Sequence, residues 1–172
     1  WHQFIFDADS ELNWIQEHIP AATATEYGKN LVDAQNMHAK HKKFAQELSG
    51  HQPMIDKVVA TGENLLLAKH FARDEIADKK QEVKEAWRDL LAKSAGRKDA
   101  LDLNLRKQKF MSEATDVEGM ISEKLQVVSS ADYGREENAA EKLLAKHKTM
   151  ETDLRACEAL VKNLRDQSSK LM

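Results

Sequence analysis

The chain has 172 residues, of which 32% are charged and 6% aromatic, and it contains six glycines and two prolines. Helices tolerate this composition, whereas sheets need frequent turn residues, so the sequence predicts an all-α protein. Basic and acidic residues are intermixed and give a net charge of −3, so no basic block indicates a nucleic-acid partner. Neither an apolar run of about 18 residues nor a signal-peptide pattern occurs, so no transmembrane helix or leader is expected.

Three helices are expected in the first part of the chain. Residues 1–22 carry apolar side chains at helical spacing, and residues 23–28 interrupt that pattern with small and polar side chains. In residues 29–68, the positions of a mostly apolar stripe recur at alternating intervals of three and four residues. This spacing indicates helices that pack with a left-handed supercoil. A third helix is expected over residues 72–105, with acidic residues in its first turn, where negative charge is favourable.

The beginning of the chain is repeated near its end. Tyr27-Gly28 recurs as Tyr133-Gly134, 106 residues later, and segment 39–42 recurs as 145–148 at the same distance. A period of this size is typical of helical repeats that stack along one chain. Residues 1–105 are therefore predicted to form one complete three-helix repeat. Residues 106–172 are predicted to supply the first two helices of another, over about 106–128 and 135–172.

No break separates the third helix from the next repeat. Residues 100–110 contain neither Pro nor Gly, and the one candidate for a stop, Asn104, stands alone between leucines. The third helix is therefore expected to continue from about residue 72 to about residue 128, so that both repeats share it. A shared helix would couple the two repeats mechanically.

The apolar stripes predict the core of each repeat. Trp14 and Trp87 lie on the apolar faces of the first and third helices, and we expect them to pack together as the anchor of the bundle. The other predicted core residues occupy the same stripes: Phe4, Ile15, Leu48, Ile76, Leu90, Phe110, Ile121 and Leu154.

Four motifs are shared with one family of helical repeats: Phe and Asp before a Trp in the first helix, an acidic-Tyr-Gly turn, Lys-His in the second helix, and His before the third helix with a Trp inside it. The matching residues are Phe4, Asp7, Trp14, Glu26-Tyr27-Gly28, Lys40-His41, His70-Phe71-Ala72, Trp87, Asp132-Tyr133-Gly134 and Lys146-His147. The chain thus resembles the spectrin repeat over its whole length. The resemblance leaves the alpha and beta chain types undecided and leans towards beta.

The resemblance implies a structural role, as a rod segment of an actin-crosslinking membrane skeleton that acts as a flexible spacer and scaffold. The implied partners are other spectrin repeats or the partner spectrin chain, with actin and ankyrin bound through the parent protein. The implied location is the cytoplasm, in the cytoskeleton at the cell cortex beneath the plasma membrane. The single cysteine, Cys157, agrees with a reducing compartment.

Two departures from the motifs fall in the second repeat. Met120 stands at the position equivalent to Trp14, next to Gly119, and Cys157 replaces His51. A glycine inside a helix costs about 1 kcal/mol relative to alanine, and a methionine buries less area than a tryptophan. The second repeat is therefore expected to be the less stable one.

Two interpretations of the two-helix second repeat stay open. In the first, the sequence is a piece of a longer protein that was cut within a repeat at Met172. In the second, the pair is a natural partial repeat that captures a partner helix, as beta spectrins do in forming tetramers, or docks an adaptor such as ankyrin. An apolar stripe would then await the partner: Leu143, Leu144, Leu154, Leu160, Val161, Leu164 and Leu171.

Few residues could carry chemistry. His38 and His41 lie one helical turn apart, a spacing that can bind metal, but no further ligand shares their stripe. Cys157 has Glu158 beside it, and a neighbouring carboxylate disfavours a reactive thiolate. Phosphate-binding loops, nucleophile elbows and paired carboxylates are not found in the sequence. No catalytic, metal-binding or cofactor-binding residue is therefore expected, and the chain is not expected to be an enzyme.

Overall fold

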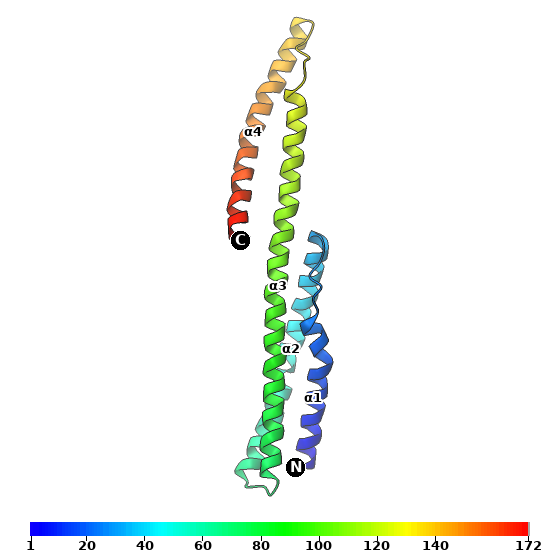
Figure 1. The fold of residues 1–172 in the computed structure, drawn as a ribbon, viewed down its shortest axis with the longest axis vertical. Helices are drawn as coiled ribbons and strands as arrows, with labels where there is room; N and C mark the ends of the chain where they lie inside the picture. The colour runs from blue at the N-terminus through cyan, green and yellow to red at the C-terminus, as the bar shows by residue number, and fades with distance from the viewer. Residues whose placement is uncertain (172) are drawn as a thin grey trace. The chain divides into compact units, whose positions relative to one another are not determined.

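A computed structural model describes residues 1–171 as four helices. They are α1 (His2–Thr23), α2 (Leu31–Leu67), α3 (Arg73–Val128) and α4 (Glu137–Leu171), shown in Figure 1. The all-α fold class is confirmed, and the helices begin and end within two residues of the expected positions. The last residue of the expected final helix, Met172, lies outside the described residues.

The chain divides into two compact units, which are described separately. Unit 1 is Trp1–Asn104 and unit 2 is Leu105–Met172. The boundary between the units falls inside α3, so this helix supplies residues to both.

Unit 1 is a three-helix bundle in which α1 and α2 run beside the first half of α3 (Figure 1). Its core follows the predicted stripes, because each amphipathic helix buries its apolar face against the other two. The largest fully buried side chains are Phe4, Ile76, Val83, Leu90 and Leu101.

Local signals in the sequence set the ends of α2. The Asn30 side chain accepts a hydrogen bond from the Asp33 backbone N–H at 2.8 Å, which caps the helix start. At the other end, Lys69 has a positive φ of 55°, and the His70 N–H donates to the Leu65 carbonyl at 3.3 Å. This is the Schellman type of helix end, in which a left-handed residue lets the next amide satisfy a free carbonyl.

A glycine is required in the turn that precedes the second helix of each repeat. Gly28 has a φ of +96° and Gly134 a φ of +81°. A Cβ on Gly28 would lie 2.4 Å from the Ala34 backbone nitrogen, and one on Gly134 would lie 2.6 Å from that of Ala140. Both the backbone conformation and the close approach therefore exclude other residues here.

Unit 2 is a pair of helices, formed by the second half of α3 and by α4 (Figure 1). Its buried side chains are Val117, Met150 and Cys157. Phe110 is half-buried, but Ile121 and Leu154 are 43% and 39% exposed, so their assignment to the core was wrong. Within the described part of unit 2, each helix has only one neighbour, which cannot cover a whole apolar face.

Candidate functional site

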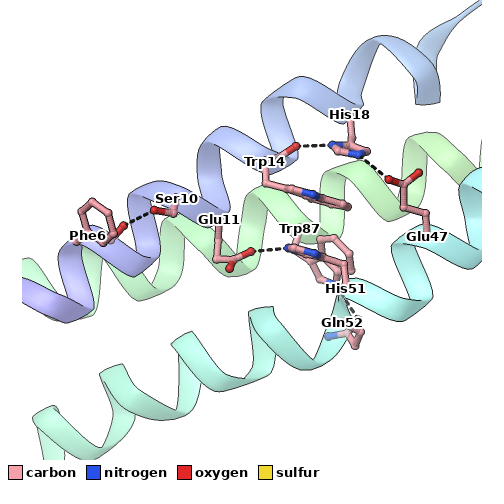
Figure 2. A network of polar contacts seen from close by, with 9 residues as sticks. All are labelled: Phe6, Ser10, Glu11, Trp14, His18, Glu47, His51, Gln52 and Trp87. Atoms are coloured by element: carbon pink, nitrogen blue, oxygen red, sulfur yellow. Dashed lines mark hydrogen bonds and ion pairs between the residues drawn. The ribbon is translucent and has the colours of Figure 1, made fainter.

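An aromatic cluster lies at the centre of unit 1, between its three helices (Figure 2). The Trp14 ring of α1 stacks against the rings of His18 and His51, with a centroid distance of 3.6 Å in each case. Trp87 of α3 lies 6.2 Å from the rings of both Trp14 and His51. The two tryptophans thus share one cluster with two histidines, neither of which was predicted as a core residue.

Two polar contacts satisfy the buried edges of this cluster (Figure 2). His51 Nε2 of α2 lies 2.5 Å from Glu11 Oε2 of α1. Trp87 Nε1 of α3 donates a hydrogen bond to Gln52 Oε1 of α2 at 2.7 Å. Because each bond joins two helices, the cluster fixes their register as well as filling space.

His18 forms a further bridge between α1 and α2. Its Nδ1 lies 2.7 Å from the Trp14 carbonyl oxygen, and its Nε2 lies 3.4 Å from Glu47 Oε1. A carbonyl and a carboxylate both accept hydrogen bonds, so both contacts are hydrogen bonds only when the ring carries two protons.

The Tyr-Gly turn of unit 1 is held against α3. Asn104 Nδ2 donates to the backbone carbonyls of Tyr27 and Gly28 at 2.7 and 3.0 Å. Arg97 Nη2 donates to the Glu26 carbonyl at 3.1 Å, and its guanidinium lies 5.8 Å from the centre of the Tyr27 ring. Asn104 therefore does not end the helix but binds the turn.

The apolar stripe expected on α4 divides into two rows. Leu144, Leu154 and Leu160 are exposed. The other members are half-buried, because α3 covers one side of α4: Leu143, Val161, Leu164 and Leu171. The expectation of one open stripe is thus wrong for the second row, which packs within unit 2.

An open groove of about 860 Å³ remains on unit 2. Ile121 of α3 and Leu154, Cys157 and Val161 of α4 supply its apolar part. Its charged lining is mainly basic and consists of Arg155, Glu158, Lys162 and Arg165. The arrangement suits an amphipathic helix whose apolar face is flanked by acidic residues.

The two histidines with metal-binding spacing have different surroundings. His38 Nε2 lies 2.9 Å from Asp102 Oδ1. The charged Lys98 beside Asp102, and then His38, hold the pKa of that carboxyl below its usual value. His41 is buried, and its ring lies 5.8 Å from the ring of Phe44. Within residues 1–171, no group of three or more His, Cys, Asp or Glu side chains is placed to hold a metal ion.

None of the helices within residues 1–171 is both long enough and apolar enough to cross a membrane.

The bundle, the recurring Tyr-Gly turn and the uninterrupted α3 define a helical-repeat protein. The family model of the spectrin repeat matches residues 1–102 and again residues 105–172. The chain therefore belongs to the spectrin-repeat family, a structural family of helical bundles.

Curated relatives include both types of spectrin chain. Spectrin alpha chain, erythrocytic 1, from Mus musculus is 33% identical over 96% of this chain and 7% of its own length. Spectrin beta chain, non-erythrocytic 5, from Homo sapiens is 33% identical over 89% of this chain and 4% of its own length. The spectrin beta chain of Drosophila melanogaster is 31% identical over 98% of this chain and 7% of its own length. The chain thus spans less than a tenth of these relatives, and equal identities leave the lean towards beta without support.

Proposed function

We propose that this chain is a rod segment of a spectrin-type membrane skeleton, where it acts as a flexible spacer and scaffold. The observation that carries the proposal is α3, which runs from Arg73 to Val128 and supplies both units. A helix of 56 residues is about 84 Å long at a rise of 1.5 Å per residue. Such a helix would link one repeat to the next through continuous backbone hydrogen bonds, with no loop between them.

The contacts near the unit boundary support this role. Asn104, the last residue of unit 1, binds the Tyr27-Gly28 turn while it remains part of α3. Leu101, one turn earlier, is fully buried. The helix is therefore stabilised by tertiary contacts up to the boundary, where its own propensity would otherwise have to suffice.

The wider setting is proposed by analogy with the named relatives. Other spectrin repeats or a partner spectrin chain would adjoin this segment, and actin and ankyrin would bind elsewhere in the parent protein. The segment would lie in the cytoplasm, at the cell cortex. Its role would be structural and not catalytic, as in the structural family to which the chain belongs.

Hydrogen exchange tests the spacer proposal directly. We expect the amides of residues 100–110 to be protected as strongly as those of residues 80–95, because the helix continues without fraying. The loop at residues 24–29 provides an internal control for rapid exchange. Exchange of residues 100–110 at the rate of this loop would contradict a spacer in which one continuous helix joins the two repeats.

A second candidate function, capture of a partner helix, is favoured by the groove of unit 2. Its apolar lining and its three basic side chains fit an amphipathic helix with acidic flanks. Leu154→Glu would place a charge in this groove, whereas Leu144→Glu changes a leucine that does not line it.

Sedimentation equilibrium over a wide concentration range tests this second function. A reversible association that Leu154→Glu abolishes and Leu144→Glu preserves would support a helix-capturing groove. A strict monomer at every concentration would favour a plain spacer.

A further inference from the structure

A second groove, of about 410 Å³, lies in unit 1 beside the turn between α1 and α2. Its polar lining comes from three parts of the bundle: Glu26 of the turn, Arg97 of α3, and Lys40, His41, Lys43 and Glu47 of α2. The spacer function uses none of these side chains to bind a ligand.

Two of the polar groups in this groove are buried without side-chain partners. His41 is only 7% exposed, and neither of its ring nitrogens bonds to another side chain, although the Ser94 backbone interacts with the ring. Arg97 Nη1 is also buried and unpartnered, although its Nη2 is held by the Glu26 carbonyl. Buried polar groups without partners are rare, because each has lost its bonds to water without replacement. A ligand that accepts hydrogen bonds from these groups would offset the free-energy cost of their missing bonds to water.

The charge of the groove indicates the sign of such a ligand. Three cations, Lys40, Lys43 and Arg97, line it together with two carboxylates, Glu26 and Glu47. Glu47 already faces the His18 ring. Burial, and then the charge of Arg97, lower the pKa of His41, as expected where the local potential is positive.

We propose that this groove binds a phosphate monoester, with Arg97 Nη1 and the His41 ring donating to its oxygens and with Lys40 and Lys43 neutralising its charge. A phosphate monoester carries close to two negative charges and three acceptor oxygens, so it can meet donors that come from two different helices. A single carboxylate has less charge and fewer acceptors. The same group occurs in free sugar or inositol phosphates and in phosphoinositide headgroups, and the experiment separates these sources.

The repeat provides an internal comparison for this proposal. An equivalent groove of about 400 Å³ in unit 2 includes Lys146 and His147, which correspond to Lys40 and His41. The His147 side chain is 54% exposed and lies 3.6 Å from Glu151, so it is neither buried nor unpartnered. Arginine is missing from the lining of this groove. Unit 2 should therefore not bind the same ligand.

Calorimetric titration of the whole chain at low salt tests the proposal, with inositol 1,4,5-trisphosphate as the soluble probe. We expect one saturable site, and a loss of affinity of about tenfold or more in the double variant Lys40→Gln, Lys43→Gln. Both lysines are exposed, so this variant should fold. Lys146→Gln is the matched control and should bind like the parent. Absence of saturable binding, or equal binding by the double variant, would overturn the proposal.

Two further measurements define the chemical class of the ligand and its source. Citrate, a carboxylate anion, should bind more weakly, and equal affinity for citrate would overturn the assignment to phosphate. Phosphatidylcholine vesicles with and without phosphatidylinositol 4,5-bisphosphate provide the membrane form of the probe. Stronger binding to the loaded vesicles than to the soluble probe would identify a headgroup site, and the reverse would identify a site for a free phosphate ester.

Discussion

Units 1 and 2 place the same residue types at equivalent positions but bury them differently. Ile15 and Leu48 in unit 1 are 3% and 2% exposed. Their counterparts in unit 2, Ile121 and Leu154, are 43% and 39% exposed. Because the side chains are identical, the difference comes from the number of neighbouring helices. Burial in this fold is a property of the assembled bundle, and the stripe on one helix does not determine it alone.

The polar pairs that join two helices differ between equivalent positions of the two units. The pair His18 and Glu47 of unit 1 is replaced in unit 2 by a salt bridge between Lys124 and Asp153. The pair Glu11 and His51 is replaced by buried Val117 and Cys157. A polar contact between two helices is therefore retained at this outer position, whereas the inner position has become apolar.

Among the changes predicted here, Trp87→Ala should have the largest effect on the stability of one unit relative to the other. It should lower the free energy of unfolding of unit 1 by about 3–5 kcal/mol, because Trp87 is 5% exposed and also donates to Gln52. Met120→Ala, at the position equivalent to Trp14, should cost less than about 1 kcal/mol. Urea unfolding followed by far-UV circular dichroism measures both, and an unchanged midpoint for Trp87→Ala would refute the role of the cluster.

Leu103→Pro should separate the two units. Proline inside a helix removes one hydrogen bond and clashes with the preceding turn, at a cost of about 3 kcal/mol or more. Leu103 is exposed, so the effect should come from the backbone and not from lost packing. We expect one cooperative thermal transition to become two in calorimetry, whereas Leu103→Ala should keep a single transition. Unchanged cooperativity in Leu103→Pro would argue against coupling through α3.

Glycines inside the helices of the two units should respond in opposite ways to alanine. A Cβ on Gly119 meets nothing within 4 Å, so Gly119→Ala should stabilise unit 2 by about 1 kcal/mol. A Cβ on Gly62 would lie 2.9 Å from Phe4 Cε2, so Gly62→Ala should destabilise unit 1 by roughly 1–3 kcal/mol. Chemical denaturation of the two variants should show midpoints that move in opposite directions.

The smallest expected effect is a pH dependence confined to unit 1. The folded pKa of His41 is lowered by burial and by Arg97. The unfolded state therefore binds a proton first, and His41 makes stability fall as the pH drops below about 6.5. The slope of stability against pH just below this value should be smaller in His41→Gln than in the parent.

The sequence by itself determined the four helices, the repeat and the glycine turns. Helical periodicity and turn chemistry are local properties of the sequence. An apolar stripe such as that of residues 29–68 therefore indicates a helix whatever the tertiary fold is. For example, α2 continues through Pro53, as its stripe predicted, because Leu48 and Ile55 are buried on either side of the proline. Gly28 and Gly134 were recognisable because the Tyr-Gly pair recurs at the repeat distance, and their positive φ values explain why glycine stands there.

Only the tertiary structure decided which members of those stripes are buried and which polar groups meet. His51 joins Trp14 and Glu11, and Asn104 reaches the Tyr27 carbonyl, across gaps of dozens of residues. The surroundings of His41 and of Arg97 Nη1 also became visible only when α2 and α3 were placed side by side. The physical reason is that the environment of a side chain is the sum of all its neighbours, and in a bundle most of them come from other helices.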